Sequence, residues 1–288
     1  MSKKNKKQKN KAKGKKLALR ITAVVFSFAL AVMGVLQLGC LYTRLTWEAY
    51  RPDYPKVDLI SVLEKAKLTD ADYELLYRQT GLTKLGIDGY LEKGDKQGIL
   101  NTQQFFFEDY EVITDCFNIF TYDETIRAHA PIANLETGDI LVTSTTRVSW
   151  WRYGHAALVV DGEKKVILES IAPGIDSKLN YASEFADLAN FLVLRPKLTA
   201  ETKQAVVRYA IDEMRGMPYG MTRGVLSKKY PETLKTTQCA HLVWYAYKKF
   251  GVDLDSNGGG IVKPQDMALS KHVEVVQAYG FDLDTLWS

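Results

Sequence analysis

Residues 138–170 read GDILVTSTTRVSWWRYGHAALVVDGEKKVILES, and this stretch decides the fold class. Short runs of aliphatic and β-branched residues are separated in it by turn residues, which is typical of strands. The dipeptide Asp161-Gly162 between two of these runs is a strong hairpin signal. The sequence therefore predicts antiparallel strands over 139–143, 155–160 and 165–170.

The chain on the C-terminal side extends this pattern. Residues 191–195 form a fourth apolar run, and a helical pattern follows from about Thr199 to Arg215. Antiparallel strands flanked by helices make an α+β layout. We therefore expect an α+β domain over residues 131–288, because helix-like patterning gives way to turns and strands near Pro131.

Residues 44–130 predict a mostly helical accessory region without a catalytic motif. Thr69 precedes a run with acidic residues in its first turn, so we expect it to cap a helix that ends at Gly81. The aromatic-rich stretch 103–119 is expected to pack against the domain that follows.

The N-terminal part predicts a membrane anchor. Residues 1–20 contain ten Lys and Arg and no acidic residue, and residues 21–43 contain no charge. As a helix, the charge-free run reaches about 34 Å, enough to cross a hydrocarbon core of about 30 Å. We therefore expect a basic cytoplasmic tail, a single-pass transmembrane signal anchor and an extracytoplasmic remainder in the cell membrane.

Two other interpretations of this segment remain open. Ala29-Leu30-Ala31 could be the cleavage site of a signal peptide. Cys40 could be lipidated, although Gln37 stands where a lipoprotein box usually carries an aliphatic residue. The apolar run continues past both positions, so an uncleaved anchor is the preferred interpretation.

The net charge of +4 comes from the basic tail alone. Without those ten residues the chain has 28 basic and 34 acidic residues, a net charge of −6. Nucleic-acid binding needs basic side chains distributed over a folded surface. We therefore expect no nucleic-acid partner.

Cys239 is the candidate nucleophile. Thr237 is expected to cap a helix that ends at Gly251, with one core-facing stripe at positions 239, 242, 243, 246 and 250. A free thiol has a pKa of about 8.5, which a helix N-terminus and a histidine can lower to about 3.5–7.5. The alternative is a buried cysteine that serves only as a small hydrophobic residue.

His155 is the expected partner of Cys239. It opens a strand directly after Gly154, whereas His241 lies about 200° around the helix from the thiol. The two remaining histidines, His129 and His272, are expected at the surface.

Hairpin register decides whether a carboxylate reaches His155. A three-residue loop would pair Val160 with Lys164 and place Glu169 opposite His155, where it could hold the second ring N–H. A two- or four-residue loop would turn Glu169 to the other face. The alternative is a solvated glutamate at a strand end.

We expect neither a cofactor nor a metal. A zinc site from Cys239, His241 and His155 is disfavoured, because the chain has no CxxC pair and the first two residues diverge on the helix. The glycines at 258–260 predict a loop and no phosphate cradle, since no strand leads into them.

Five segments carry a family resemblance. They are 135–140 (LETGDI), 154–159 (GHAALV), 216–219 (GMPY), 238–247 (QCAHLVWYAY) and 261–267 (IVKPQDM). In this order, with the histidine before the cysteine, they resemble the YiiX-like branch of permuted papain-like enzymes, relatives of the NlpC-type cell-wall peptidases. The resemblance implies a permuted papain-like fold, an antiparallel sheet with flanking helices.

The same resemblance implies roles and a substrate class. It assigns Tyr219 to the active-site wall near the oxyanion position, beside the Cys239, His155 and Glu169 triad. The implied activity is that of an amidase or endopeptidase acting on cell-wall peptide or another envelope amide.

Two alternative functions remain open. Ala240-His241 departs from the Ser-Glu common in this branch and is similar to the lecithin:retinol acyltransferase-like group, which would make the acyl acceptor a lipid. Trp150 and Trp151 could then line an apolar cleft, although core packing is the preferred interpretation. A non-catalytic envelope binding module is the second alternative, and a disulfide between Cys116 and Cys239 would favour it.

Overall fold

The computed structural model describes residues 3–116, 121–221 and 223–287. The chain divides into two compact units, residues 1–47 with 148–151 and residues 48–147 with 152–288. Helices combine with antiparallel strands in the larger unit, so the predicted α+β class is confirmed.

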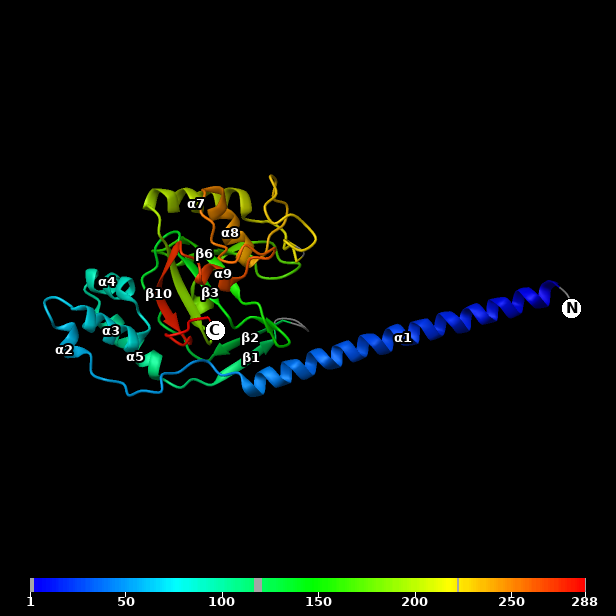
Figure 1. Ribbon diagram of the computed structural model, residues 1–288, viewed down its shortest axis with the longest axis horizontal. Helices are drawn as coiled ribbons and strands as arrows, with labels where there is room; N and C mark the ends of the chain where they lie inside the picture. Colours follow the sequence, from blue (N-terminus) through cyan, green and yellow to red (C-terminus); the bar gives the residue numbers. More distant parts are fainter. Residues whose placement is uncertain (1–2, 117–120, 222, 288) are drawn as a thin grey trace. The chain divides into compact units, whose positions relative to one another are not determined.

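A six-stranded antiparallel sheet forms the centre of the larger unit, in the order β10-β9-β3-β6-β7-β8 (Figure 1). Its strands are β3 (Ile140–Thr143), β6 (His155–Asp161), β7 (Val166–Glu169), β8 (Lys178–Tyr181), β9 (Phe191–Pro196) and β10 (Val273–Tyr279). The four predicted strands are present, and β8 and β10 are additional. Every residue of β3 is buried, so the hydrophobic core lies around the middle of the sheet.

Helices α7 (Ala200–Met214) and α8 (Cys239–Lys249) pack against β6 and against each other. Figure 1 shows both helices on the same side of the sheet. The first nine residues of α8 are all buried, a wider buried surface than the single predicted stripe. Tyr247 of α8 donates a hydrogen bond to the Gly138 carbonyl, which ties the helix to the segment before β3.

The hairpin between β6 and β7 does not have the predicted register. Asp161 pairs with Val166, so the loop has four residues, 162–165, and Val160 forms a bulge. The predicted pair of Val160 with Lys164 is therefore wrong. A sequence pattern shows where a hairpin turns, but a bulge leaves no separate signature in it.

Glu169 nevertheless lies on the same face as His155. Ala157 is the residue opposite Glu169, so the predicted direct pairing of His155 with Glu169 is also wrong. A four-residue loop alone would place Glu169 on the opposite face of the sheet from His155. The bulge at Val160 adds one residue to β6, which returns Glu169 to the face that carries His155. His155 and Glu169 are diagonal neighbours, which long side chains can bridge.

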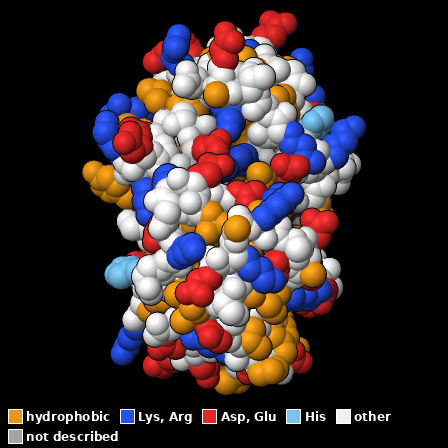
Figure 2. Space-filling view, turned by 90° about the vertical axis from the view of Figure 1, so that its left-hand side faces the viewer, with side chains coloured by type: hydrophobic (Ala, Val, Ile, Leu, Met, Phe, Trp, Pro, Cys, Tyr) orange, Lys and Arg blue, Asp and Glu red, His pale blue; other side chains and the backbone are white. Residues whose placement is uncertain are grey.

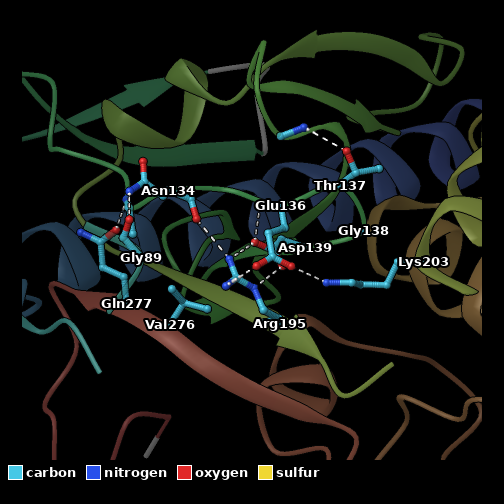
Figure 3. A network of polar contacts seen from close by, with 12 residues as sticks. Gly89, Asn134, Glu136, Thr137, Gly138, Asp139, Arg195, Lys203, Val276 and Gln277 are labelled. Atoms are coloured by element: carbon cyan, nitrogen blue, oxygen red, sulfur yellow. Dashed lines mark hydrogen bonds and ion pairs between the residues drawn. The ribbon is translucent and has the colours of Figure 1, made fainter. Parts of the chain in front are cut away.

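A polar network connects β9, α7 and the segment before β3 (Figure 3). Arg195 donates to the two carboxylate oxygens of Asp139 at 3.0 and 2.8 Å and pairs with Glu136 at 2.8 Å. Lys203 donates to the other oxygen of Glu136 at 2.5 Å. Burial raises the pKa of Asp139, although the bonds from Arg195 oppose this shift. The acidic residues of the LETGDI segment therefore hold the sheet to α7.

The accessory region contains α2 (Ile60–Leu63), α3 (Asp70–Thr80), α4 (Lys84–Glu92) and α5 (Lys96–Phe107). Thr69 caps α3 through a capping box with Asp72, and Gly81 ends it with a left-handed φ of 68°, both as predicted. Thr83 donates its backbone N–H to Val276 of β10. This contact brings the helical region to an edge of the main sheet.

The mostly helical prediction for 44–130 missed a hairpin. Strands β1 (Val112–Cys116) and β2 (Thr121–Ile126) pair antiparallel and belong to a second sheet, of order β1-β2-β4-β5, with β4 (Arg147–Val148) and β5 (Trp151–Arg152). β-branched residues are frequent in both strands, which favours extended structure. The neighbouring aromatic residues obscured this pattern, and Phe117 lies outside the described residues.

The smaller unit contains α1 (Lys3–Thr46). Its segment Lys13–Thr46 is long and apolar enough to cross a membrane. The side chains of residues 13–32 are exposed, which distinguishes α1 from a core helix of a soluble protein.

Candidate active site

The imidazole of His155 and the carboxylate of Glu169 are in direct contact. The His155 Nε2–H donates to Glu169 Oε2 at 2.8 Å, and the two side chains are 14% and 4% exposed. Asn180 of β8 donates to the second oxygen of Glu169 at 2.8 Å. Burial opposes the charge on Glu169, but the bonds from His155 and Asn180 outweigh it and lower the pKa of this carboxyl.

Cys239 is the first residue of α8 and is 4% exposed. Its position places the sulfur at the positive end of the helix dipole, as predicted. The cap differs from the prediction, because Gln238 occupies the N-cap position and no side chain caps the helix. The hydroxyl of Thr237 instead contacts His241 Nδ1 at 3.0 Å, so it is not available for the helix N-terminus.

Cys239 acts on His155 from the start of α8, since together with Glu169 it raises the pKa of this imidazole. Nε2 is engaged by Glu169, which leaves Nδ1 as the ring nitrogen for a second partner. Burial alone would lower the pKa of His155, but the bonds to Cys239 and Glu169 raise it to about 10. The carboxylate of Glu169 on β7 and Cys239 on α8 thus act on the same imidazole of β6.

Two tyrosines lie near enough to Cys239 for its charge to act on them. Burial first, and then the charge of Cys239, raise the pKa values of Tyr219 and Tyr153, so both phenols keep their protons. Tyr219 is held beside the start of α8 by a parallel bridge to Thr237, and Gly220 donates to the Thr237 carbonyl at 2.7 Å. Tyr153 was not predicted. Its position two residues before His155 is the only sequence signal for it.

A cavity of about 170 Å³ opens beside His155. Three carboxylates line it, from Asp123, Glu169 and Glu184, and Phe185 stacks on the imidazole with ring centroids 5.7 Å apart. Burial raises the pKa of Asp123 despite a bond from Thr146 and the charge of His155. The Oδ1 atom of Asp123 is buried without a hydrogen-bond partner among the described residues. Asp123 was also missed, because it lies on the unpredicted strand β2.

The other histidines lie outside this arrangement. His241 is buried, and its Nε2–H donates to the Lys229 carbonyl at 2.8 Å. Burial is the main cause that lowers its pKa to about 4, so the ring is neutral. His129 is exposed and contacts Asp187. His241 therefore supports the chain around α8 and does not reach the sulfur.

Three further interpretations of the sequence concern a metal site, a disulfide and the two tryptophans. Over residues 3–116, 121–221 and 223–287, no group of three or more His, Cys, Asp or Glu side chains is arranged to hold a metal. Within the described residues, Cys40, Cys116 and Cys239 form no disulfide. Trp150 and Trp151 are 55% and 56% exposed, so the prediction of core packing is wrong, and neither lines the cavity.

Comparison with models of known protein families gives no match to this chain, and comparison with curated proteins gives none either. The chemistry of the site must therefore be inferred from its own residues.

Proposed function

We propose that this protein is a membrane-anchored thiol hydrolase with a permuted papain-like fold, and that it cleaves an amide in the cell envelope. The observation that carries the proposal is the His155 imidazole, which is hydrogen-bonded to Glu169 at 2.8 Å and whose pKa is raised by Cys239 and Glu169 together. A nucleophile, a base and a group that orients the base form the arrangement that nucleophilic catalysis requires.

In the first half of the reaction the Cys239 thiolate attacks the amide carbonyl. The new C–S bond gives a tetrahedral oxyanion, which collapses to a thioester as the C–N bond breaks. The protonated His155 gives its proton to the departing amine. Glu169 holds the ring in place through Nε2 and favours its charged form.

In the second half of the reaction water replaces the amine. His155 accepts a proton from the water molecule, which attacks the thioester carbonyl. The carboxylic acid leaves, and the sulfur and imidazole return to their charged pair. Atoms balance over the two halves, because one amide and one water give one acid and one amine.

Two donors are available to the oxyanion. The backbone N–H of Cys239 is at the start of α8, where N–H groups have no partner within the helix. The phenol of Tyr219 keeps its proton, and the residue lies beside the start of α8 through its bridge to Thr237. Loss of one oxyanion donor typically costs about 2.7–4 kcal/mol of transition-state stabilisation.

The cavity favours a peptide-like substrate. Its three carboxylates attract hydrogen-bond donors and positive charge, which peptides with free amino groups provide and fatty acyl chains do not. Acidic and basic side chains are interspersed over the face in Figure 2, so this face offers no continuous basic surface for nucleic acid. Cell-wall peptide or another envelope amide therefore suits the proposed location outside the membrane.

Product analysis tests the proposal. Full-length protein in detergent is incubated with a muropeptide mixture from digested cell wall, and the products are identified by mass spectrometry. We expect new free amino and carboxyl ends with the parent protein and none with Cys239→Ala. Cys116→Ala is the matched control, because this exposed free cysteine lies outside the proposed site and its loss should change nothing.

The other outcomes distinguish the alternatives. Full amide cleavage by Cys239→Ala would contradict the proposal. If added lipid or amine yields acyl-transfer products without free acid, the protein is an acyltransferase that uses the same thioester. If substrate binds but is never cleaved, the site is a binding module.

A further inference from the structure

The turn between β4 and β5 belongs to the same compact unit as α1. This turn comprises residues 148–151, of sequence VSWW, and carries no charge. The two arginines that flank it, Arg147 and Arg152, both pair with Glu124. The charged groups are thus held at the base of the turn, and its tip is entirely uncharged.

The tip packs closely against one part of α1. Ser149 Oγ donates to the Leu36 carbonyl at 2.7 Å. One turn further along the helix, a Cβ atom at Gly39 would overlap the ring of Trp150, so the helix backbone and the ring touch only because residue 39 is glycine. Ser149 itself has a left-handed φ of 54°, which is unfavourable for a serine. These contacts outweigh that strain and fix the turn on the helix.

The part of α1 that the tip touches belongs to the charge-free run 21–43. Gly39 lies four residues before the end of this run, about 6 Å along a helix axis. When the run crosses a bilayer with its N-terminus in the cytoplasm, Gly39 is at the level of the outer interface between hydrocarbon and headgroups. Tryptophan is enriched at this depth, because its ring is apolar and its N–H remains hydrated.

Exposure of the two rings agrees with this depth. Trp150 and Trp151 are 55% and 56% exposed, and Tyr42 on the same stretch of α1 is 66% exposed. Three large aromatic side chains thus occupy the outer end of the helix and the turn packed on it. If the turn faced water, the apolar surface of these rings would be hydrated, and exposed apolar patches of this kind usually mark a contact with a membrane or another protein.

We propose that the turn 148–151 is a second membrane contact, in which Trp150 and Trp151 enter the outer interface of the bilayer beside α1. This inference rests on the membrane-anchor part of the proposed function and not on the hydrolase chemistry. A single helix would leave the chain free to rotate about the helix axis. The second contact restricts this rotation, because the turn must stay in the outer interface beside α1.

Tryptophan fluorescence in vesicles tests the proposal. The full chain is reconstituted into phosphatidylcholine vesicles with brominated acyl chains, and flotation first verifies that α1 has inserted. We compare the parent with the double variant Trp150→Phe and Trp151→Phe, in which apolar rings remain but the two fluorophores are lost. We expect the double variant to lose most of the emission that brominated lipid quenches. Trp287→Phe, at the C-terminal end, is the matched control and should retain it.

Two outcomes would overturn the second contact. In the first, acrylamide in the water quenches the emission of the two tryptophans and brominated lipid does not, so the turn lies in water. In the second, neither quencher reaches them, so the turn is buried against another protein or a second copy. Failure of flotation would instead refute the anchor itself, and neither result depends on amide hydrolysis.

Discussion

At the scale of residues, the candidate site depends on the imidazole of His155 and on the two groups that raise its pKa, Glu169 and Cys239. The carboxylate of Glu169 and the sulfur of Cys239 together overcome the effect of burial on His155 and keep the imidazole charged. Glu169 cannot turn away easily, because Asn180 holds its second oxygen. The proton that the mechanism requires is therefore stored on His155 before the substrate arrives.

Glu169→Gln should lower the pKa of His155 from about 10 toward its ordinary value of 6.5. The amide removes a negative charge that stabilises the imidazolium. NMR titration of the imidazole signals measures the shift. Asp187→Asn is the matched control, because Asp187 contacts only the exposed His129 among the histidines. An unchanged titration of His155 in Glu169→Gln would contradict the role given to this carboxylate.

The same shift predicts how stability depends on pH. Because the pKa of His155 is raised by folding, its contribution is fully present below about pH 6.5 and is lost as the pH rises toward 10. We expect the free energy of unfolding to fall less steeply over this window in Glu169→Gln than in the parent. Urea unfolding curves between pH 6.5 and 10 check this, and parallel curves for the two proteins would be evidence against it.

Tyr219→Phe should reduce kcat by about 10²–10³-fold with little change in KM, because only the transition state carries the oxyanion that the phenol binds. Steady-state kinetics on the cleaved amide measure both constants. Tyr181→Phe on the exposed edge strand β8 is the control and should behave as the parent. A rise in KM without a fall in kcat would assign Tyr219 to substrate binding alone.

At the scale of elements, the sequence predicted the central strands and the nucleophile helix well. Runs such as ILVT and HAALVV are apolar enough to be read as strands, and the thiol at the first turn follows from local spacing. The bulge at Val160 and the second sheet could not be foreseen, because both depend on pairing with distant segments. Asp123 was missed for the same reason, since only the folded second sheet brings it to the cavity.

The approach of the accessory helices to β10 yields a prediction on stability. Gly81 has a φ of 68°, and a Cβ there would overlap the Ala278 carbonyl of β10. Gly94 has a φ of 70° but open space around it. Both alanine variants should lose about 1–2 kcal/mol to backbone strain. Gly81→Ala should lose more than Gly94→Ala by urea unfolding, and equal losses would show that the close contact is unimportant.

At the scale of the whole molecule, the basic tail, the apolar helix and the acidic remainder differ in charge and hydropathy. Ten positive charges precede the charge-free run and none of the first 20 residues is acidic, which favours a cytoplasmic N-terminus. The rest of the chain, including the site, then lies outside. The N-terminal helix was predictable because length and hydropathy alone define it, whereas its contact with the turn 148–151 was not.

Cys116 provides a direct test of this topology, because it is an exposed cysteine outside any disulfide among the described residues. We expect a membrane-impermeant maleimide to label Cys116 in intact cells that express the full chain. Cys116→Ala should lose this label and serves as the control. Labelling that appears only after the cells are lysed would show that the body lies in the cytoplasm.

The most direct test of the central claim compares the reactivity of two cysteines in one protein. Iodoacetamide is added across a range of pH, and peptide mass spectrometry quantifies alkylation at Cys239 and at the exposed reference Cys116. If His155 activates the sulfur, Cys239 reacts much faster than Cys116 at pH values below neutrality. His155→Ala should abolish this difference. A Cys239 that reacts no faster than Cys116 at any pH, and equally with or without His155, would contradict the account.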